Sequence, residues 1–276
     1  MCVRPAQRSW SDMGWIRKNA VIIVGLLVIG YILLPNIVVV IFSFNKPAGR
    51  YNYEWTQFSL DAWLNPCASP GMCSALGLSL GIGVTAAAVS TVMGTMAAFA
   101  LVRYRFRGRG TTNLLIFFPM ATPEVVMGSS LLTLFVAVGI GSGITTILIA
   151  HILFTLSFVI TTVKARVASL DPALEQAAAD LYATPAQAFW KVTFPLVAPG
   201  IAAGALLAFA LSFDDYIVTN FNAGATTVTF PMYVWGAAQR GVPVQVNVVG
   251  TIMFLGAITI VGLAQAVGAR KRKVDA

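Results

Sequence analysis

Six long apolar segments dominate this sequence and restrict the folds that it can adopt. Each has about 20 residues or more, the helical length that crosses roughly 30 Å of hydrocarbon. Only 10% of the 276 residues are charged, whereas soluble domains average about a quarter. The sequence therefore predicts an all-α integral membrane protein with six transmembrane helices, at residues 20–44, 75–101, 113–138, 144–163, 196–221 and 248–267.

Lysine and arginine fall mainly on one side of these spans. If the N-terminus is cytosolic, fifteen lie inside and three lie outside, namely Lys46, Arg50 and Arg240. Such a bias predicts that both termini are cytosolic. The net charge of +8 then reflects topology rather than nucleic-acid binding, and the basic run at 103–109 is expected to anchor lipid headgroups. The expected organisation is a cytosolic segment at 1–19, a transmembrane domain at 20–269 and a basic cytosolic tail at 270–276.

The longest polar interruption, residues 170–199, lies on the predicted cytosolic side and has the pattern of two short helices. Asp171 is expected to cap the first helix, with Pro172 where a missing N–H costs nothing. Thr184 and Gln187 have capping-box spacing for the second. The first helix is expected to carry a narrow apolar face of Leu174, Ala177, Ala178 and Leu181. A small prefolded surface of this kind indicates a docking site for a partner; the alternative is an ordinary amphipathic loop.

The same segment resembles the EAA coupling loop of ABC-importer permeases. In that pattern Glu-Ala-Ala, three residues, glycine and nine further residues precede Ile-x-Leu-Pro, and here Gln176-Ala177-Ala178 begins the match and Pro195 closes it. The resemblance implies type I ABC-importer permease architecture, with a loop at 164–195 that contacts a cytosolic ATPase. The implied ATPase-coupling residues are Glu175, Gln176, Ala177, Ala178, Asp180, Leu181, Tyr182 and Pro195.

Two positions depart from the pattern. Gln176 replaces its glutamate, although Glu175 is adjacent, and Tyr182 replaces its glycine. Glycine adopts a left-handed turn readily, whereas another residue does so at a cost of roughly 1–2 kcal/mol. The first helix is therefore expected to run on toward Thr184 before the chain turns.

Three carboxylates lie inside predicted spans, where each costs roughly 2.5–3.5 kcal/mol at mid-membrane. These are Glu124 in the third span and Asp214 and Asp215 in the fifth, and no lysine or arginine lies in any span to neutralise them. They are expected to line a path for a cationic solute, with cation–π support from Tyr216. The alternative is that they are protonated or hydrogen-bonded at a helix interface. Successive helical residues point about 100° apart, so both aspartates cannot face one pore squarely.

The stretch SFDDYIV at 212–218 resembles the Ser-x-Asp-Asp segment of spermidine/putrescine permeases, and so do TPEVVMG at 122–128 and GVPVQVN at 241–247. This resemblance implies a multi-pass subunit of the bacterial inner membrane that moves polyamines into the cytosol. It also implies a second homologous permease, two ATPase subunits and an extracytoplasmic binding protein. The chain has no Gly-x-x-x-x-Gly-Lys-[Ser/Thr] motif, so ATP and Mg²⁺ are expected on the partner ATPase and no cofactor on this chain.

The single histidine and three cysteines argue against a metal site rich in these residues. His151 lies in an apolar segment and is expected to be packed and hydrogen-bonded. Cys67 and Cys73 share the first external loop, where a local disulfide and two free thiols both remain open.

Other functions remain as alternatives. An ABC permease of this kind could carry iron, thiamine or a phosphonate instead of a polyamine. A proton-coupled secondary transporter would use the intramembrane carboxylates directly, but such proteins often contain inverted repeats, and no convincing repeat is present. A membrane-embedded enzyme is disfavoured because the sequence contains no nucleophile–base–carboxylate set. The chain is therefore expected not to be an enzyme.

Overall fold

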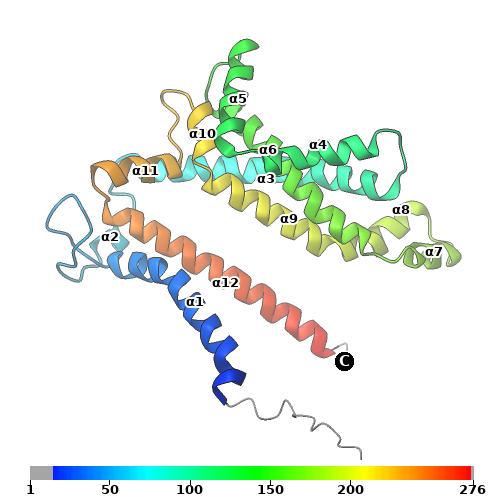
Figure 1. Ribbon diagram of the computed structural model, residues 1–276, viewed down its shortest axis with the longest axis horizontal. Helices are drawn as coiled ribbons and strands as arrows, with labels where there is room; N and C mark the ends of the chain where they lie inside the picture. The colour runs from blue at the N-terminus through cyan, green and yellow to red at the C-terminus, as the bar shows by residue number, and fades with distance from the viewer. Residues whose placement is uncertain (1–14, 275–276) are drawn as a thin grey trace, which may run out of the picture. The chain divides into compact units, whose positions relative to one another are not determined.

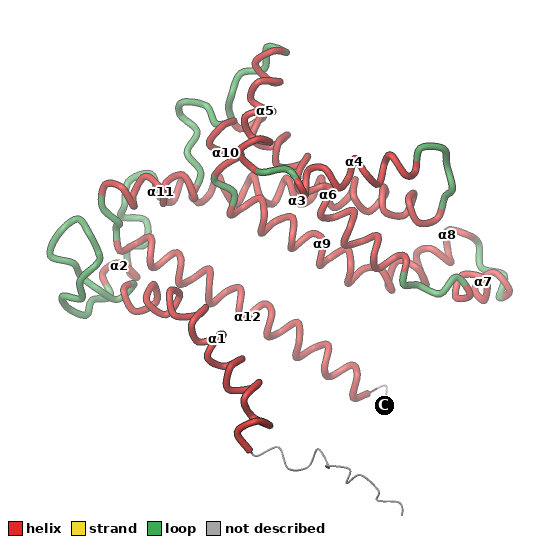
Figure 2. The backbone as a smooth tube through the Cα atoms, viewed as in Figure 1, coloured by secondary structure: helices red, strands yellow, loops and turns green. Residues whose placement is uncertain are grey.

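The computed structural model describes residues 15–274, which form helices joined by loops and no strand beyond one isolated bridge between Asn45 and Phe58 (Figures 1 and 2). The expectation of an all-α protein is confirmed for this part of the chain. The helices are α1 (Trp15–Phe42), α2 (Asp61–Leu64), α3 (Met72–Arg103), α4 (Arg109–Ala121), α5 (Glu124–Ala137), α6 (Ile144–Ala168), α7 (Ala173–Asp180), α8 (Pro185–Ala188), a π-helix (Phe189–Thr193), α9 (Phe194–Asp214), α10 (Ile217–Asn222), α11 (Phe230–Arg240) and α12 (Val244–Val274).

The chain divides into two compact units, one formed by residues 70–236 and the other by residues 1–69 with 237–276. Most of the predicted segment 1–19 lies outside the described residues, as do residues 275 and 276 of the predicted tail.

Helices α3, α6 and α9 form the core of the 70–236 unit. The buried cluster between them consists of small or β-branched residues: Ala87, Ala98, Val159, Val163, Val167, Val197 and Ala208. Gly94 shows why small residues are needed, because a Cβ atom there would lie 2.6 Å from the Cγ1 atom of Val159. Without a hydrophobic driving force in lipid, helices associate through such close backbone approach. Gly94 thus allows α3 and α6 to pack closely, whereas Gly77 and Gly81 of the same helix have no other atom within 4 Å of where a Cβ would lie.

Two of the predicted spans are interrupted. The segment expected as one helix at 113–138 forms α4 and α5, which are bent by 108°. The break lies at Thr122, which is extended (ψ 131°), followed by Pro123. Proline disfavours helical geometry in the preceding residue and lacks an N–H group, which accounts for the break. Similarly, α9 ends at Asp214, and the extended Asp215 separates it from α10.

Among the residues that the structure describes, four helices are long and apolar enough to cross a bilayer, and the bent α4–α5 pair adds a fifth if it counts as one span. The four are Asn19–Phe42, Met72–Arg103, Ile144–Ala168 and Pro185–Asp214. The apolar part of α12 within the described residues, Val244–Thr259, is shorter than these. The count of six spans stays a prediction.

The other unit packs α12 against α1 and α2 and holds the loop between α1 and α2 by polar contacts. Asn45 is buried, donating to Asn52 Oδ1 at 2.7 Å and accepting from the backbone N–H of Thr56 at 2.8 Å. Gly241 has φ 130°, and its Cα approaches Arg50 so closely that a Cβ would lie 2.7 Å from the Arg50 carbonyl oxygen. A residue without a side chain is therefore required at this turn.

Candidate functional site

The 170–199 segment forms two short helices at one end of the 70–236 unit. The Asp171 carboxylate accepts from the backbone N–H of Ala173 at 2.9 Å and so caps α7. Thr184 and Gln187 exchange the two bonds of a capping box, at 2.9 and 3.3 Å, at the start of α8. Both predicted caps are confirmed, because oxygen side chains before a helix satisfy its first free N–H groups.

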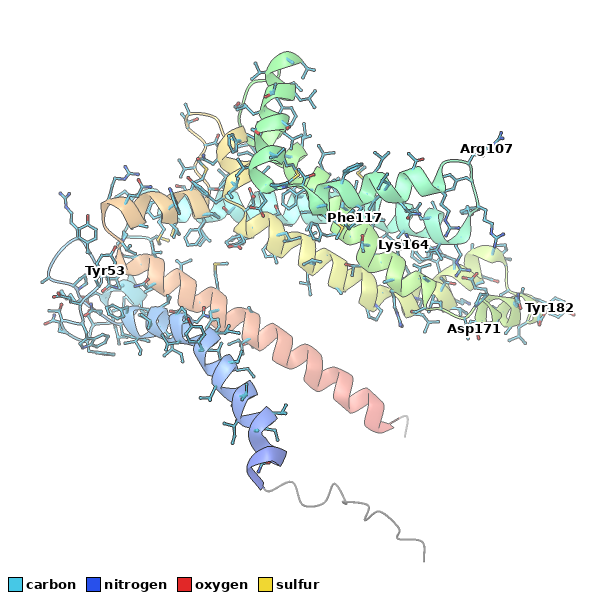
Figure 3. All side chains as sticks on the ribbon, in the orientation of Figure 1. Tyr53, Arg107, Phe117, Lys164, Asp171 and Tyr182 are labelled. Carbon is cyan, nitrogen blue, oxygen red and sulfur yellow. The ribbon has the colours of Figure 1, made fainter. Side chains whose placement is uncertain are left out.

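The apolar face predicted on α7 is left open to its surroundings. None of the residues of α7 is buried, and its flanking Leu181 is 82% exposed. Figure 3 shows Asp171 and Tyr182 at the same end of this unit as Arg107, which belongs to the basic 103–109 segment. The loop is therefore a surface that the rest of its own unit, residues 70–236, does not cover.

The first helix ends earlier than expected. It was predicted to run on toward Thr184, but α7 ends at Asp180 and Tyr182 adopts a left-handed conformation with φ 60°. Two backbone bonds close the helix: the N–H of Ala183 donates to Ala178 at 3.0 Å, and the N–H of Tyr182 donates to Ala179 at 2.9 Å. This pair of bonds is the Schellman motif. The prediction failed because these bonds, and the start of α8 directly afterwards, require a turn here despite the cost to tyrosine.

Glu175 connects three elements. Its carboxylate accepts two hydrogen bonds of 2.6 Å from the Arg103 guanidinium at the end of α3. It also accepts from the Thr193 hydroxyl of the π-helix. No local pattern indicates this arrangement, since Arg103 and Glu175 are 72 residues apart and the basic run that begins at Arg103 predicts contact with lipid headgroups. Bidentate Arg–carboxylate pairs fix geometry as well as charge.

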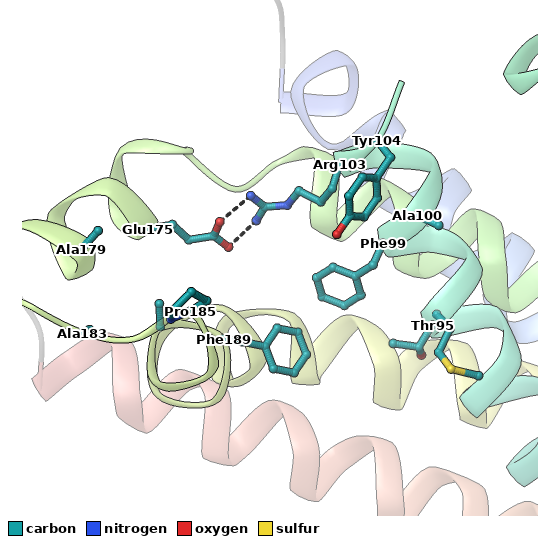
Figure 4. A pocket seen from close by; sticks show the side chains of 12 residues that line it. Thr95, Phe99, Ala100, Arg103, Tyr104, Glu175, Ala179, Ala183, Pro185 and Phe189 are labelled. Atoms are coloured by element: carbon teal, nitrogen blue, oxygen red, sulfur yellow. Dashed lines mark hydrogen bonds and ion pairs between the residues drawn. The ribbon is translucent and has the colours of Figure 1, made fainter. Parts of the chain in front are cut away.

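A pocket of about 810 Å³ separates the end of α3 from α7, α8 and the π-helix (Figure 4). Its walls are mainly apolar, with Phe99 of α3 and Phe189 of the π-helix in edge-to-face contact at 5.5 Å. Arg103 and Glu175 form its polar edge (Figure 4). The hollow leaves α7 held to α3 by the ion pair rather than by close packing.

The second half of the loop is joined rigidly to the membrane helices. Residues Pro185–Asp214 form one nearly continuous helix, with the π-helix as an irregular turn inside it. Single π-turns of this kind occur frequently at functional sites. Behind it, Gly200 allows the Arg166 side chain of α6 to cross, and Arg166 Nε donates to the carbonyl of Leu196 at 2.8 Å. Movement of α8 would therefore be passed directly to α9.

Asp215 is buried at the break between α9 and α10. Its side chain is 5% exposed and accepts from the backbone N–H of Thr219 at 2.7 Å and from the Thr219 hydroxyl at 2.8 Å. One carboxylate oxygen lies 3.3 Å from His151 Nε2. This geometry matches the alternative of a carboxylate hydrogen-bonded at a helix interface, and it gives α10 an acidic cap at its N-terminus.

His151 is the centre of this network. It is 1% exposed, with Nδ1 at 2.7 Å from the Ser212 hydroxyl and Nε2 at 2.9 Å from the Thr219 hydroxyl. The expectation of a packed, hydrogen-bonded histidine is confirmed. The sequence does not indicate its partners. Through Ser212 and Thr219, His151 connects α6 to both sides of the α9–α10 break, and it lies beside Asp215.

The other acidic candidates are exposed. Asp214 is the last residue of α9, and Glu124 lies in the first turn of α5. Tyr216 stacks on Trp235 of α11, with ring centroids 5.2 Å apart. The two breaks lie on elements that pack together, because Gly128 of α5 lies so close to α10 that a Cβ atom there would be 3.2 Å from the Cα atom of Val218.

Of the two alternatives left open for Cys67 and Cys73, the structure has the disulfide, because both cysteines are disulfide-bonded. No group of three or more His, Cys, Asp or Glu side chains that could hold a metal ion occurs among the described residues.

The profile of a protein family described as "Binding-protein-dependent transport system inner membrane component" matches residues 90–273. The chain is 38% identical over 254 residues to the putrescine transport system permease protein PotI of Escherichia coli (strain K12), covering 90% of this chain and 89% of that protein. It is 34% identical over 241 residues to the spermidine/putrescine transport system permease protein PotC of Haemophilus influenzae, covering 87% and 93%.

Two solved structures share the fold. A chain of a bacterial ABC transporter that imports the acidic polysaccharide alginate aligns with a TM-score of 0.67 at 16% identity, covering 96% of this chain and 99% of that one. A chain of an amino acid ABC transporter aligns with a TM-score of 0.58 at 16% identity, covering 78% and 100%.

Proposed function

The chain belongs to the family of binding-protein-dependent transport system inner membrane components, and from this we propose that it is the polyamine-conducting permease subunit of an ABC importer. Membership places it in the bacterial inner membrane as a multi-pass transport component. The observation that carries the solute assignment is the similarity to both a putrescine and a spermidine/putrescine permease over about nine-tenths of the chain.

The proposed assembly contains two permeases, of which this chain is one. Two cytosolic ATPase subunits would bind ATP and Mg²⁺, and an extracytoplasmic binding protein would deliver the solute. The transmembrane domain at 20–269 is proposed to have six spans, with both termini of the chain in the cytosol. Its support is the clustering of the basic 103–109 segment and the 170–199 loop at one end of the 70–236 unit (Figure 3).

Energy would enter through α7. Closure of the ATPase pushes on the exposed Ala177 face, and two connections carry the movement into the spans. One is the Glu175–Arg103 pair, which pulls on α3. The other is the continuous Pro185–Asp214 helix, which carries displacement of α8 to the break at Asp215. The pocket beneath α7 gives the helix room to shift without compressing packed side chains.

The solute path is proposed to run past Asp214 and Glu124. Asp214 is the stronger cation site on physical grounds, because it adds its charge to the negative end of the α9 dipole. The charge of Glu124 is opposed by the positive end of α5. Tyr216 offers an aromatic face beside Asp214. Asp215 is proposed to hold the α9–α10 break in place rather than to bind the solute, since its carboxylate already contacts His151 and Thr219.

Uptake by a reconstituted importer tests this function. Proteoliposomes would hold the permease pair and the ATPase, with binding protein outside, and radiolabelled putrescine or spermidine would be followed in the presence of ATP. We expect uptake that needs ATP and that unlabelled polyamines inhibit. If iron, thiamine or a phosphonate inhibited uptake and unlabelled polyamines did not, that compound would be the solute instead of a polyamine. Uptake by this chain without an ATPase would favour the secondary-transporter alternative.

A further inference from the structure

The pocket between α3 and the α7–α8 segment lies across the end of a membrane helix. Its α3 lining runs from Thr95 to Tyr104, and the part up to Ala100 falls inside the segment 75–101 that is expected to cross the bilayer. From Thr95 to Arg103 this lining follows roughly 12 Å of helix. That length is close to the thickness of one leaflet, which is half of a hydrocarbon layer of about 30 Å.

The interior of the pocket is apolar and open. Phe99 and Phe189 contribute aromatic rings to it (Figure 4), and Met96 in its lining is 61% exposed. Of the side chains that line it, only those of Arg103 and Glu175 are charged, and these two are paired at the edge. A concave, mainly apolar hollow with a few polar groups is typical of a ligand site. In a membrane, an acyl chain covers such a surface without exposing it to water.

The charges at this end of the unit favour an anionic ligand. The segments 103–109 and 164–195 together contain seven lysine or arginine residues, Lys191 among them, and three acidic residues, of which one lines the pocket. Four of the seven basic residues lie in 103–109, directly after the α3 wall. Basic pockets between membrane helices bind anionic lipid headgroups.

Arg103 can bind such a headgroup without releasing Glu175. A guanidinium has five N–H donors, and the Glu175 carboxylate accepts one bond from Nη1 and one from Nη2. The donors that remain, including Nε–H, have the planar geometry that suits a phosphate. Tyr104 follows Arg103 at the rim of the pocket and adds a hydroxyl group there (Figure 4).

We propose that this pocket binds a phospholipid with an anionic headgroup. One acyl chain lies along Met96 and Phe99 of α3 and against Phe189, and the phosphate lies at Arg103 and Tyr104. This inference needs the chain to be in the inner membrane but does not depend on the solute or the ATPase of the proposed function. A flexible acyl chain yields when α7 shifts, whereas closely packed side chains would resist the movement.

Photo-crosslinking tests the site on the full-length protein, purified with its bound subunits and placed in nanodiscs. Two probes carry a photoreactive group in one acyl chain, one an anionic phosphatidylglycerol and the other a zwitterionic phosphatidylcholine, and mass spectrometry locates the labelled residues. We expect the anionic probe to label Met96 and Phe189 about fivefold more than the zwitterionic probe, the preference that one arginine confers near a charged lipid surface. Both probes should label the exposed Leu115 of α4 to the same extent.

Matched variants separate this pocket from general contact with lipid. Ala100→Trp and Ala179→Trp fill the pocket from α3 and from α7, because both alanines are exposed and line it, and each should prevent labelling there. Ala88→Trp, at an exposed position of α3 outside the lining, should not. Arg103→Gln should remove the preference for the anionic probe, whereas Arg107→Gln, which lies outside the lining, should retain it.

Three results would overturn the proposal. An unlabelled pocket in the wild type would show that another part of the assembly covers it. Equal labelling by both phospholipids, or equal loss of preference in Arg103→Gln and Arg107→Gln, would show unspecific contact with lipid. Labelling by a photoreactive fatty acid added from the aqueous phase, with none by either phospholipid, would assign the pocket to a soluble amphiphile. Thermal unfolding checks that each variant is folded, and the tryptophans on two different helices preserve the test if one variant is not.

Discussion

The guanidinium of Arg103 meets the carboxylate of Glu175 edge to edge, with both nitrogen–oxygen distances at 2.6 Å. The pair joins the end of α3 to a helix that has no buried residue of its own. Both side chains are partly exposed, so the bond contributes little to stability, about 1 kcal/mol or less. Its importance is geometric, because it couples α7 to a membrane helix across a pocket.

Breaking this pair is predicted to uncouple the importer without unfolding it. Glu175→Gln leaves a residue of the same shape that cannot form the charged pair, and Arg103→Lys loses the bidentate geometry. We expect more ATP hydrolysed per solute transported, with a thermal unfolding temperature close to that of the wild type. The exchange variant Arg103→Glu with Glu175→Arg should recover part of the coupling. If Glu175→Gln hydrolysed the wild-type amount of ATP per solute transported, the Arg103–Glu175 pair would not couple α7 to α3.

The His151–Asp215 contact is predicted to stabilise the α9–α10 break. His151→Leu leaves the buried Asp215 carboxylate without its ring partner, and a buried polar group that loses a partner destabilises the fold. Thermal unfolding should occur at a markedly lower temperature in this variant. The double variant His151→Leu with Asp215→Asn should unfold at a temperature closer to the wild type, because no buried charge remains. Equal destabilisation of the single and double variants would contradict the pairing.

Close approach of α3 and α6 predicts opposite effects for two glycines of one helix. Gly94→Ala places a Cβ 2.6 Å from the Cγ1 atom of Val159, and overpacking of this kind typically costs about 1–3 kcal/mol. Gly81→Ala meets nothing within 4 Å and replaces glycine by a better helix former. Unfolding in detergent should separate them, with Gly94→Ala less stable than the wild type and Gly81→Ala at least as stable.

The exposed carboxylates are predicted to affect transport rather than folding. Asp214→Asn should reduce polyamine uptake more than Glu124→Gln, because the α9 dipole reinforces the charge of Asp214 whereas the α5 dipole opposes that of Glu124. Both variants should unfold like the wild type, in contrast to Asp215→Leu, which removes a buried cap. Polyamine uptake that survives neutralisation of Asp214 and Glu124 together would remove them from the path.

Sequence reasoning succeeded where the signal is local or compositional. The caps at Asp171 and Thr184 follow from side-chain chemistry within three residues, and the all-helical fold follows from the apolar segments. It failed for the direction that a helix takes after a break and for contacts between residues that are far apart in the sequence. Hydropathy does not show that Thr122 and Pro123 turn the third segment by 108°. Spacing does not connect Arg103 with Glu175, and propensity argued against the left-handed Tyr182 that two backbone hydrogen bonds impose.

Asp214 and Asp215 are a second case in which the sequence could not predict a contact between distant residues. Their helical spacing indicated that they could not both face one pore, and the structure exposes Asp214 while burying Asp215. Which of the two would be buried depended on His151, which lies 64 residues before Asp215 in the sequence. Only the packing of α6 against the break reveals that choice.

We propose that ATP drives polyamine uptake through the α7 surface, and the variant Ala177→Phe tests this step. Ala177 is exposed on α7, a helix without any buried residue, so a larger side chain there changes the surface that a partner would contact rather than a packed core. The measurement is polyamine uptake per ATP hydrolysed in proteoliposomes that contain the complete importer. We expect wild-type vesicles to take up polyamine with ATP, whereas Ala177→Phe vesicles should contain folded permease and lose uptake. Undiminished ATP-driven uptake by Ala177→Phe would show that the ATPase does not act through α7.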